Sequence, residues 1–272
     1  MSDKKRVDVA LVERGLAASR EKAQALVMSG VVYIGENKVT KASATVTPED
    51  NLIVRQTGTG YVSRGALKLE KGLKVFSYDP AGVVAMDLGA STGGFTDVLL
   101  QNGAAHVYSI DVGYGQLDWK LRNDPRVTVM ERTNARYLKP EDLPLHPTLG
   151  VMDVSFISIT KILPAAAQIM GEDGAFISLI KPQFEAGRDR VGKKGVVRDK
   201  LVHRDVILEI LEFIDKEMGW TAQDLSFSPI KGPEGNIEFL VYILPKSRAT
   251  HEVTREEVDA VVEQAHASLK DA

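Results

Sequence analysis

The sequence contains no cysteine and no long hydrophobic run. Without cysteine, its 272 residues cannot form a disulfide scaffold or a thiolate metal site, and we expect no bound metal. No apolar stretch approaches the length of a membrane-spanning helix, and the opening residues MSDKKRVDVALVERG lack the apolar core of a signal peptide. We therefore expect a soluble, cytoplasmic protein that does not insert into membranes.

The sequence also has little net charge, −3 in all, but its charged residues are unevenly distributed. Residues 1–75 contain 13 Lys and Arg against 8 Asp and Glu, so the basic excess lies at the N-terminus and the remainder is acidic. A basic N-terminal region on an otherwise acidic protein is compatible with a polyanionic partner. A basic excess this small is also typical of an ordinary solvated surface.

The first sixty residues have the pattern of a small separate module. Residues 7–16 carry apolar side chains at helical spacing, and a second helix is expected from an N-cap at Ser19 to a stop at Gly30. Short strands are expected at VVYIG, KVT and NLIVR. Since QTGTG is typical of a linker, we expect an α+β domain over residues 1–60 and a larger domain over residues 61–272.

The stretch RVDVALVERGLAASREKAQALVMSGVVYIGENKV resembles the RNA-binding module named after ribosomal protein S4. The residues that carry the resemblance are Arg6, Asp8, Leu11, Ser19, Arg20, Ala23, Gly30, Val31 and Val32. The resemblance implies that basic side chains contact RNA phosphates and that Asp8 orients the first helix. The implied phosphate contacts are Arg6, Arg20, Lys22 and Lys38. Without the resemblance, Arg20 and Lys22 would be ordinary exposed helix residues.

From residue 82 onward, apolar strands alternate with helical stretches. The strands are expected at VVAMDLG, HVYSID, RVTVME, LGVMDVS, AFISLIK, LSFSPI and IEFLVYIL. The helices are expected at 92–102, 114–123, 135–142, 158–170, 199–219 and 252–270. Only KGPEGN separates the last two strands, which predicts an antiparallel hairpin, whereas the alternation elsewhere predicts a parallel sheet covered on both faces. The expected fold class is α/β, a Rossmann-like class I methyltransferase sheet with six parallel strands and one antiparallel strand.

The stretch AMDLGASTGGFTDVLL places a glycine-rich turn between the first of these strands and its helix. Ligands of doubly wound sheets lie beyond the carboxyl ends of the strands. The turn lacks the G-x-G-x-x-G order of a dinucleotide site and the lysine of a phosphate loop. It matches instead the D/E-x-G-x-x-x-G turn of methyltransferases that use S-adenosylmethionine (SAM). We therefore expect SAM as the cofactor, with a nicotinamide dinucleotide as the alternative.

The residues expected in this cofactor site are Asp87, Gly89, Ser91, Gly93, Gly94, Phe95, Asp111 and Asn134. Asp87 would hold the methionine ammonium group, and Asp111, which ends the second strand, would accept hydrogen bonds from the ribose hydroxyls. The glycines would let the backbone approach the ligand. Asn134 would contact the adenine edge or, equally, form the N-cap of the next helix, and the alternative role of Asp111 is a cap at the strand end.

Four further residues, Lys68, Asp153, Lys181 and Glu238, stand in the contexts YVSRGALKLE, VMDVSF, SLIKPQFEAG and GNIEFLVYI. In that order they resemble the Lys-Asp-Lys-Glu tetrad of the FtsJ-like ribose 2′-O-methyltransferases. The whole chain resembles the TlyA family, known both as ribosomal RNA cytidine-2′-O-methyltransferases and as hemolysins, except that Ala66 replaces the glycine expected there. The resemblance implies methyl transfer to a ribose 2′-hydroxyl of ribosomal RNA, with that RNA or the ribosomal subunits as partners.

Such a reaction needs a base, because a ribose hydroxyl is a poor nucleophile. Lys181 ends a central strand, where partial loss of solvent and a second ammonium group at Lys68 would favour its neutral amine. Asp153 would position Lys181, and Glu238 would position Lys68. Taken one at a time, these residues would be ordinary salt-bridge partners.

Two further features bear on RNA. The segment GRDRVGKKGVVRDKLVHR, residues 187–204, carries seven Lys and Arg against two Asp, and its Lys193 and Lys194 would contact phosphates unless the segment is a solvated insertion. Phe156 either stacks on a flipped base or, as we favour, belongs to the core. The competing function classes are a noncatalytic RNA-binding protein of ribosome assembly, which the intact tetrad opposes, and a pore-forming hemolysin, which the lack of membrane-inserting segments opposes.

Overall fold

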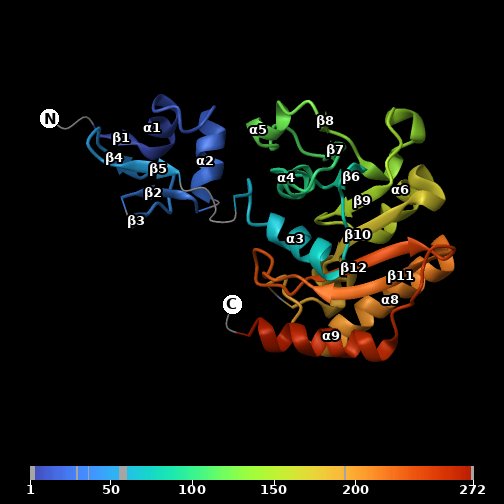
Figure 1. Ribbon diagram of the computed structural model, residues 1–272. Coiled ribbons are helices and arrows are strands. Elements are labelled where there is room, and N and C mark those ends of the chain that lie inside the picture. The colour runs from blue at the N-terminus through green and yellow to red at the C-terminus, as the bar shows by residue number, and fades with distance from the viewer. Residues whose placement is uncertain (1–3, 29, 36, 55–59, 193, 271–272) are drawn as a thin grey trace. The chain divides into compact units, whose positions relative to one another are not determined.

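The computed structural model describes residues 4–28, 30–35, 37–54, 60–192 and 194–270. The chain forms two compact units, Met1–Tyr61 and Val62–Ala272, each with its own core (Figure 1).

The first unit packs two helices, α1 (Val7–Glu13) and α2 (Arg20–Met28), against short antiparallel strands. One sheet has the order β3-β2-β5, and a separate pair is formed by β1 and β4. These strands are β1 (Lys5–Arg6), β2 (Val32–Ile34), β3 (Asn37–Lys38), β4 (Thr45–Val46) and β5 (Leu52–Val54). Apolar side chains from both helices and from the strands form one buried cluster, which includes Leu11, Val27 and Val32. The sequence predicted both helices and the three-stranded sheet but not the pairing of β1 with β4.

The second unit is built around a seven-stranded sheet of order β11-β12-β10-β9-β6-β7-β8. Its strands are β6 (Val84–Leu88), β7 (His106–Ile110), β8 (Val127–Met130), β9 (Leu149–Met152), β10 (Ala175–Ile180), β11 (Trp220–Phe227) and β12 (Phe239–Pro245). β12 runs antiparallel to its neighbours β10 and β11, and every other pair is parallel. Six strands therefore share one direction and one is reversed, which confirms the predicted fold class.

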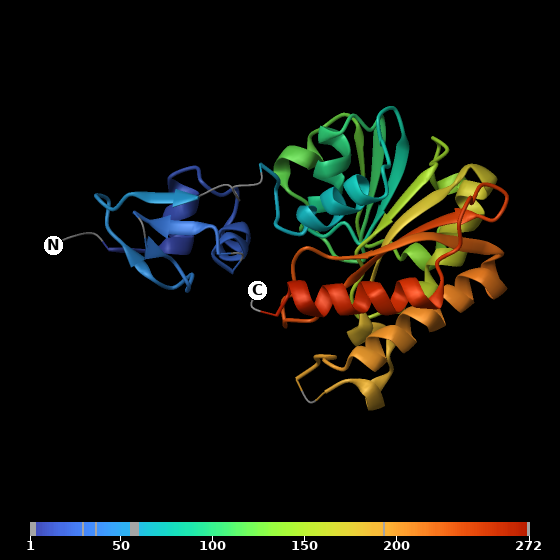
Figure 2. The same ribbon diagram turned by 60° about the horizontal axis from the view of Figure 1, so that its bottom comes forward.

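Helices cover both faces of this sheet (Figure 2). On one face lie α3 (Ala66–Val75), α4 (Gly94–Gln101) and α5 (Trp119–Arg122), and on the other lie α6 (Leu163–Met170), α8 (Lys200–Met218) and α9 (Arg255–Ser268). Since both faces are covered, the strands are almost continuously apolar. A search of the described residues finds no helix with the length and apolar character needed to cross a membrane.

Some connections differ from the sequence prediction. The helix expected at 114–123 begins only at Trp119, because the side chain of Asp118 caps it. The helix expected at 135–142 consists of two short 3-10 turns, and Pro140, which begins the second, has no amide hydrogen to continue a helix. The sequence analysis did not predict α3 or the single-turn α7 (Pro182–Glu185).

Candidate active site

Four polar side chains meet at the carboxyl edge of the large sheet. Asp153 and Lys181 directly follow β9 and β10. Glu238 directly precedes β12, and because β12 is reversed, its first residue lies at this same edge, where Phe239 pairs with Ile180. Lys68 reaches the edge from the first turn of α3, which packs against β10 and β12. The topology therefore gathers residues from four separate parts of the sequence.

These side chains form a continuous chain of ion pairs, which we call the Lys-Asp-Lys-Glu network. Lys68 Nζ lies 2.6 Å from Glu238 Oε2 and 3.3 Å from Asp153 Oδ2. Lys181 Nζ lies 2.5 Å from Asp153 Oδ1 and donates a hydrogen bond of 3.1 Å to Ser155 Oγ. Both expected pairs, Asp153–Lys181 and Glu238–Lys68, are in contact. The sequence analysis missed Ser155, although it stands two residues after Asp153.

The network fixes the charge of its central members. Burial alone would lower the pKa of Lys68, but the carboxylates of Asp153 and Glu238 together raise it above its usual value. Burial opposes ionisation of Asp153, yet the two lysines hold the pKa of Asp153 below its usual range. Lys68 is thus a permanent cation at neutral pH, held between two carboxylates. Lys181 lies at the outer end of this network, where it contacts Asp153 and Ser155.

Phe156 is not a core residue, and the interpretation favoured from the sequence is wrong. Its side chain is 90% exposed, and its backbone has φ +65°, a left-handed conformation that bulky residues rarely adopt. The ring lies 5.1 Å from that of Phe184, whose own ring centre is 5.9 Å from Lys181 Nζ. Phe156 is thus an exposed ring packed on the partly buried Phe184 beside the amine, and backbone strain of this kind is concentrated at functional sites.

Asp87 lies in the sheet below the glycine turn and is fully buried. Its Oδ2 accepts hydrogen bonds from the amide (2.9 Å) and the hydroxyl (2.7 Å) of Thr96 on α4. Its Oδ1 has no hydrogen-bond partner among the described residues. Burial raises the pKa of Asp87 to about 7, although the hydrogen bonds from Thr96 act in the opposite direction. An unpaired buried carboxylate oxygen of this kind fits a cationic group of a ligand.

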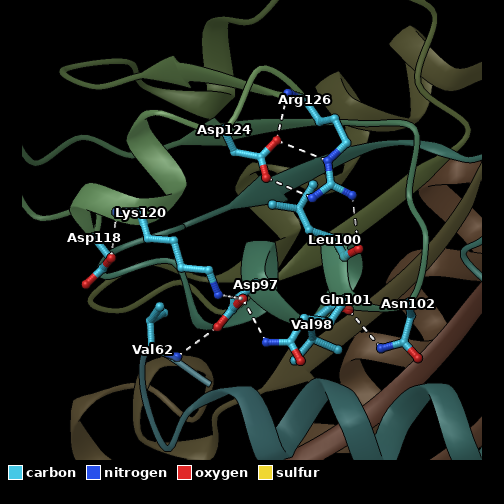
Figure 3. Close-up of polar contacts among 10 residues, drawn as sticks. All are labelled: Val62, Asp97, Val98, Leu100, Gln101, Asn102, Asp118, Lys120, Asp124 and Arg126. Carbon is cyan, nitrogen blue, oxygen red and sulfur yellow. Dashed lines mark hydrogen bonds and ion pairs between the residues drawn. The ribbon is translucent and has the colours of Figure 1, made fainter. Parts of the chain in front are cut away.

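The buried carboxylate of Asp97 anchors the segment of the chain that precedes Lys68. Figure 3 shows Asp97 of α4 accepting a hydrogen bond from the Val62 amide, at 2.8 Å to Oδ2, and another from the Gln101 side chain. The Lys120 ammonium lies 3.8 Å from the same carboxylate. Asp97 thus ties the start of the second unit to the helix that begins at the glycine turn. The sequence analysis did not identify this residue.

Asp111 and Asn134 both accept hydrogen bonds from backbone amides, Asp111 from the glycine turn as well as from its own loop. Asp111 accepts a hydrogen bond from the Ser91 amide at 2.8 Å and one from the Gly113 amide at 2.7 Å, one on each carboxylate oxygen. Asn134 Oδ1 caps the following 3-10 turn by accepting from the Arg136 amide. Each carboxylate oxygen of Asp111 retains a second lone pair for a ligand hydroxyl, whereas the Asn134 oxygen already has a capping role.

The glycines of the turn are required by the protein's own packing. Gly89 and Gly93 have φ +87° and +96°. A Cβ atom on Gly89 would lie 2.8 Å from the Asp153 carbonyl oxygen, and one on Gly93 would lie 2.3 Å from Leu121 Cδ1. Similarly, a Cβ on Gly94 would lie 2.4 Å from Ser63 Oγ, and Phe95 is buried. The missing side chains therefore bring the turn close to neighbouring segments, which the sequence analysis had attributed to a ligand alone.

In the first unit, Asp8 holds two of the expected RNA contacts. Its fully buried carboxylate pairs with the guanidinium groups of Arg6 (2.9 Å) and Arg20 (3.1 Å), and Gln24 donates to it as well. The hydrogen bonds from Arg6, Gln24 and Arg20 keep the pKa of Asp8 far below its usual value despite its burial. Asp8 thus orients two half-exposed arginines in addition to its place in α1.

The other expected RNA contacts lie at the surface. Lys22 is partly exposed, and Lys38 and Lys194 are exposed. Lys194 lines a hollow of about 310 Å³ together with Arg190 and Arg198. Lys193 lies outside the residues that the structure describes.

Comparison with known proteins agrees with both units. The FtsJ-like methyltransferase family model matches residues 61–243, and the S4 domain model matches residues 5–52. Bacillus subtilis YqxC, described as an rRNA methyltransferase candidate, is 49% identical over 273 residues, covering 99% of this chain and 97% of that protein. The 16S/23S rRNA (cytidine-2′-O)-methyltransferase TlyA of Mycobacterium tuberculosis is 45% identical over 244 residues, covering 89% and 91%.

A solved structure gives the same relationship. A Streptococcus thermophilus protein described as a hemolysin candidate superposes with a TM-score of 0.78 at 42% sequence identity. The match covers 99% of this chain and 98% of that one, so it includes both units.

Proposed function

Because the chain belongs to the FtsJ-like methyltransferase family, we propose that it transfers the methyl group of SAM to the ribose 2′-hydroxyl of a cytidine in ribosomal RNA. The observation that carries this proposal is the Lys-Asp-Lys-Glu network beside the glycine turn. Support for the substrate comes from the S4 domain and from the relative named as an rRNA (cytidine-2′-O)-methyltransferase.

The residues around the turn fit this cofactor. Asp87 Oδ1, buried and without a described partner, would accept the methionine ammonium group. The free lone pairs of Asp111 would accept the ribose hydroxyls. When bound, SAM would supply an electrophilic methyl group. These contacts would orient it toward the edge of the sheet where Lys181 stands, and alignment of this kind accounts for much of the rate of such transfers.

Lys181 would take the proton of the 2′-hydroxyl as the methyl group passes from sulfur to oxygen. When Lys181 is neutral, Asp153 still contacts the ammonium group of Lys68, which it then shares with Glu238. The exposed ring of Phe156 would stack on the extruded target base, next to the amine that receives the proton.

Mass spectrometry of ribosomal RNA tests the function directly. Ribosomal RNA from cells that lack the gene should lose a 2′-O-methylcytidine, and the purified protein with SAM should restore it. Unchanged modification in those cells, together with no incorporation in vitro, would refute the proposal.

We expect the affinity for S-adenosylhomocysteine to rise about tenfold between pH 6 and pH 8. The free protein holds Asp87 with a pKa of about 7, so below that pH the ammonium group must displace a proton from Asp87 before it can pair with the carboxylate. Above it the carboxylate is already formed and the affinity levels off. Calorimetry in buffers of different ionisation enthalpy would detect proton release at the lower pH.

Two variants serve as controls for this pH dependence. Asp87→Asn should bind weakly with a flat profile. Asp111→Ala should lose roughly 1–3 kcal/mol of binding free energy and still bind more tightly as the pH rises, with the rise moved to lower pH because the Asp111 charge helps to raise the pKa of Asp87. If the affinity of the wild-type protein for S-adenosylhomocysteine did not change with pH, Asp87 would not be a contact of the ligand.

The double variant Lys22→Gln/Lys38→Gln should bind ribosomal subunits more weakly and with a salt dependence reduced by about two phosphate contacts, and it leaves the arginines on the buried Asp8 in place. Its affinity for S-adenosylhomocysteine should be unchanged, because neither lysine belongs to the second unit. The exposed Lys74 and Arg255 provide a matched control, since Lys74→Gln/Arg255→Gln removes as much charge elsewhere. Equal RNA binding by the two double variants would contradict the assigned role of the first unit.

A further inference from the structure

A second concave site lies on the methyltransferase unit, formed by three segments that are far apart in the sequence. It is a hollow of about 150 Å³. Its cationic side chains are Arg198 from the basic segment after β10, Lys231 from the loop before β12, and Lys270 at the end of α9. His266 of α9 completes the polar lining, and none of the described residues that line it is acidic. We call this feature the basic hollow.

The walls of the basic hollow are held in place by buried hydrogen bonds. Asn236, only 2% exposed, accepts from the Val197 amide and donates to the Gly195 carbonyl, each at 2.9 Å. His203 lies under the same wall, with its ring nitrogens 3.1 Å from the Val197 carbonyl and 2.9 Å from His266. The segment that carries Arg198 is therefore fixed to both of the other segments.

The charge of the basic hollow comes from its arginine and lysines. Burial chiefly lowers the pKa of His266, with a further contribution from the nearby Lys200, so its imidazole is neutral at physiological pH. Of the acids close to it, Glu263 is paired with Lys200 at 2.5 Å, and Asp199 caps the start of α8. Arg198 and Lys270 are exposed and form no ion pair with another described residue. The hollow is thus a concentrated positive site, and a phosphate is the natural counterpart.

One wall of the basic hollow is shared with the active site. The loop between β11 and β12 supplies Lys231, Gly235 and Ile237 to the hollow. A Cβ atom on Gly232 of that loop would lie 2.7 Å from Glu238 Oε1, so the same loop also contacts the Lys-Asp-Lys-Glu network. The loop between β11 and β12 therefore lies between the basic hollow and the Lys-Asp-Lys-Glu network. An RNA strand with one nucleotide at Lys181 would find this cationic site on the other side of that loop.

We propose that the basic hollow binds a backbone phosphate of the substrate RNA, close to the nucleotide that is methylated. The identity of the polyanion rests on the proposed function, whereas the site itself rests on the charges and walls described above. The contact would select for RNA that continues past the target nucleotide, because a single nucleoside cannot occupy both the hollow and the network. It would also add to the RNA affinity that the first unit provides.

Lys270→Gln alone should lose part of the RNA affinity, because Lys270 lines the basic hollow only, whereas Arg198 also lines the hollow of Lys194. The double variant Arg198→Gln/Lys270→Gln removes two exposed side chains and leaves the walls intact. Its affinity for ribosomal subunits should fall about tenfold at physiological salt, and the slope of log K against log salt should fall by about one phosphate contact. The variant Lys74→Gln/Arg255→Gln, with the same change in charge on the same unit, should bind as the wild type does. S-adenosylhomocysteine should bind all of these proteins equally, which shows that the fold is retained.

The outcomes of this experiment distinguish a failure of the phosphate site from a failure of the proposed function. Equal RNA affinity of the hollow variant and its control overturns the proposal. Binding of inorganic phosphate that is lost in the hollow variant, with RNA affinity unchanged, would assign the hollow to a small anion and likewise overturn it. If the hollow variant loses RNA affinity but the wild type transfers no methyl group, the proposed function fails while the RNA site stands.

Discussion

Replacing Lys181 by alanine should lower the rate of methyl transfer at least about 100-fold while leaving the affinities for RNA and S-adenosylhomocysteine nearly unchanged. The expectation follows from its place at the free end of the Lys-Asp-Lys-Glu network, where it contacts Asp153 and Ser155. Single-turnover transfer of a labelled methyl group, together with calorimetry for both ligands, measures the three quantities separately.

Lys181→Arg distinguishes a base from a simple positive charge. A guanidinium group stays protonated in proteins and cannot accept the proton of the hydroxyl, so this variant should fail almost as completely as alanine. Ser155→Ala is the matched control for the position of the amine, because it removes one hydrogen bond and retains the ion pair with Asp153. An arginine variant that recovered most of the rate would make Lys181 a positioning residue, with the proton leaving to water.

The sequence was sufficient to predict the parts of the molecule that depend on regular patterns. The alternation of apolar strands and helices predicted the parallel sheet, and the short KGPEGN connection predicted the reversed strand. Because that strand is reversed, Glu238 at its start reaches the same edge as Lys181 at the end of β10. The site therefore follows from topology once its four residues have been singled out.

Features that depend on close packing could not be predicted in this way. The exposure of Phe156 depends on a left-handed backbone conformation, which its sequence context does not encode in a recognisable pattern. Gly93 combines φ +96° with a close approach to the side chain of Leu121, which is distant in sequence and reaches the turn only in the folded unit. The sequence analysis paired Lys68 with Glu238, and the further contact of Lys68 with Asp153 depends on how α3 packs against the sheet.

We expect Lys68→Met to lower the free energy of unfolding by about 3–5 kcal/mol, the usual cost of removing one partner of a buried ion pair. Lys68 lies between Asp153 and Glu238, and Glu238 is only 1% exposed. Without Lys68, Asp153 retains Lys181, but Glu238 is left as a buried carboxylate that has lost the ammonium group paired with it. Lys74→Met, which changes an exposed lysine on the same helix, should alter stability by no more than about 0.5 kcal/mol.

Adding Glu238→Gln to Lys68→Met should restore part of the lost stability, because the double variant no longer contains an unpaired buried charge. Urea unfolding of the two single variants and the double variant gives the coupling energy between the side chains, expected at about 0.5–3 kcal/mol. The two variants that lack Lys68 should transfer methyl groups slowly, since Lys181 is then the remaining partner of Asp153 in the described network and a neutral Lys181 would leave this carboxylate without a cation. Additive losses of stability, or a double variant less stable than Lys68→Met, would mean that Lys68 is held by packing and not by charge.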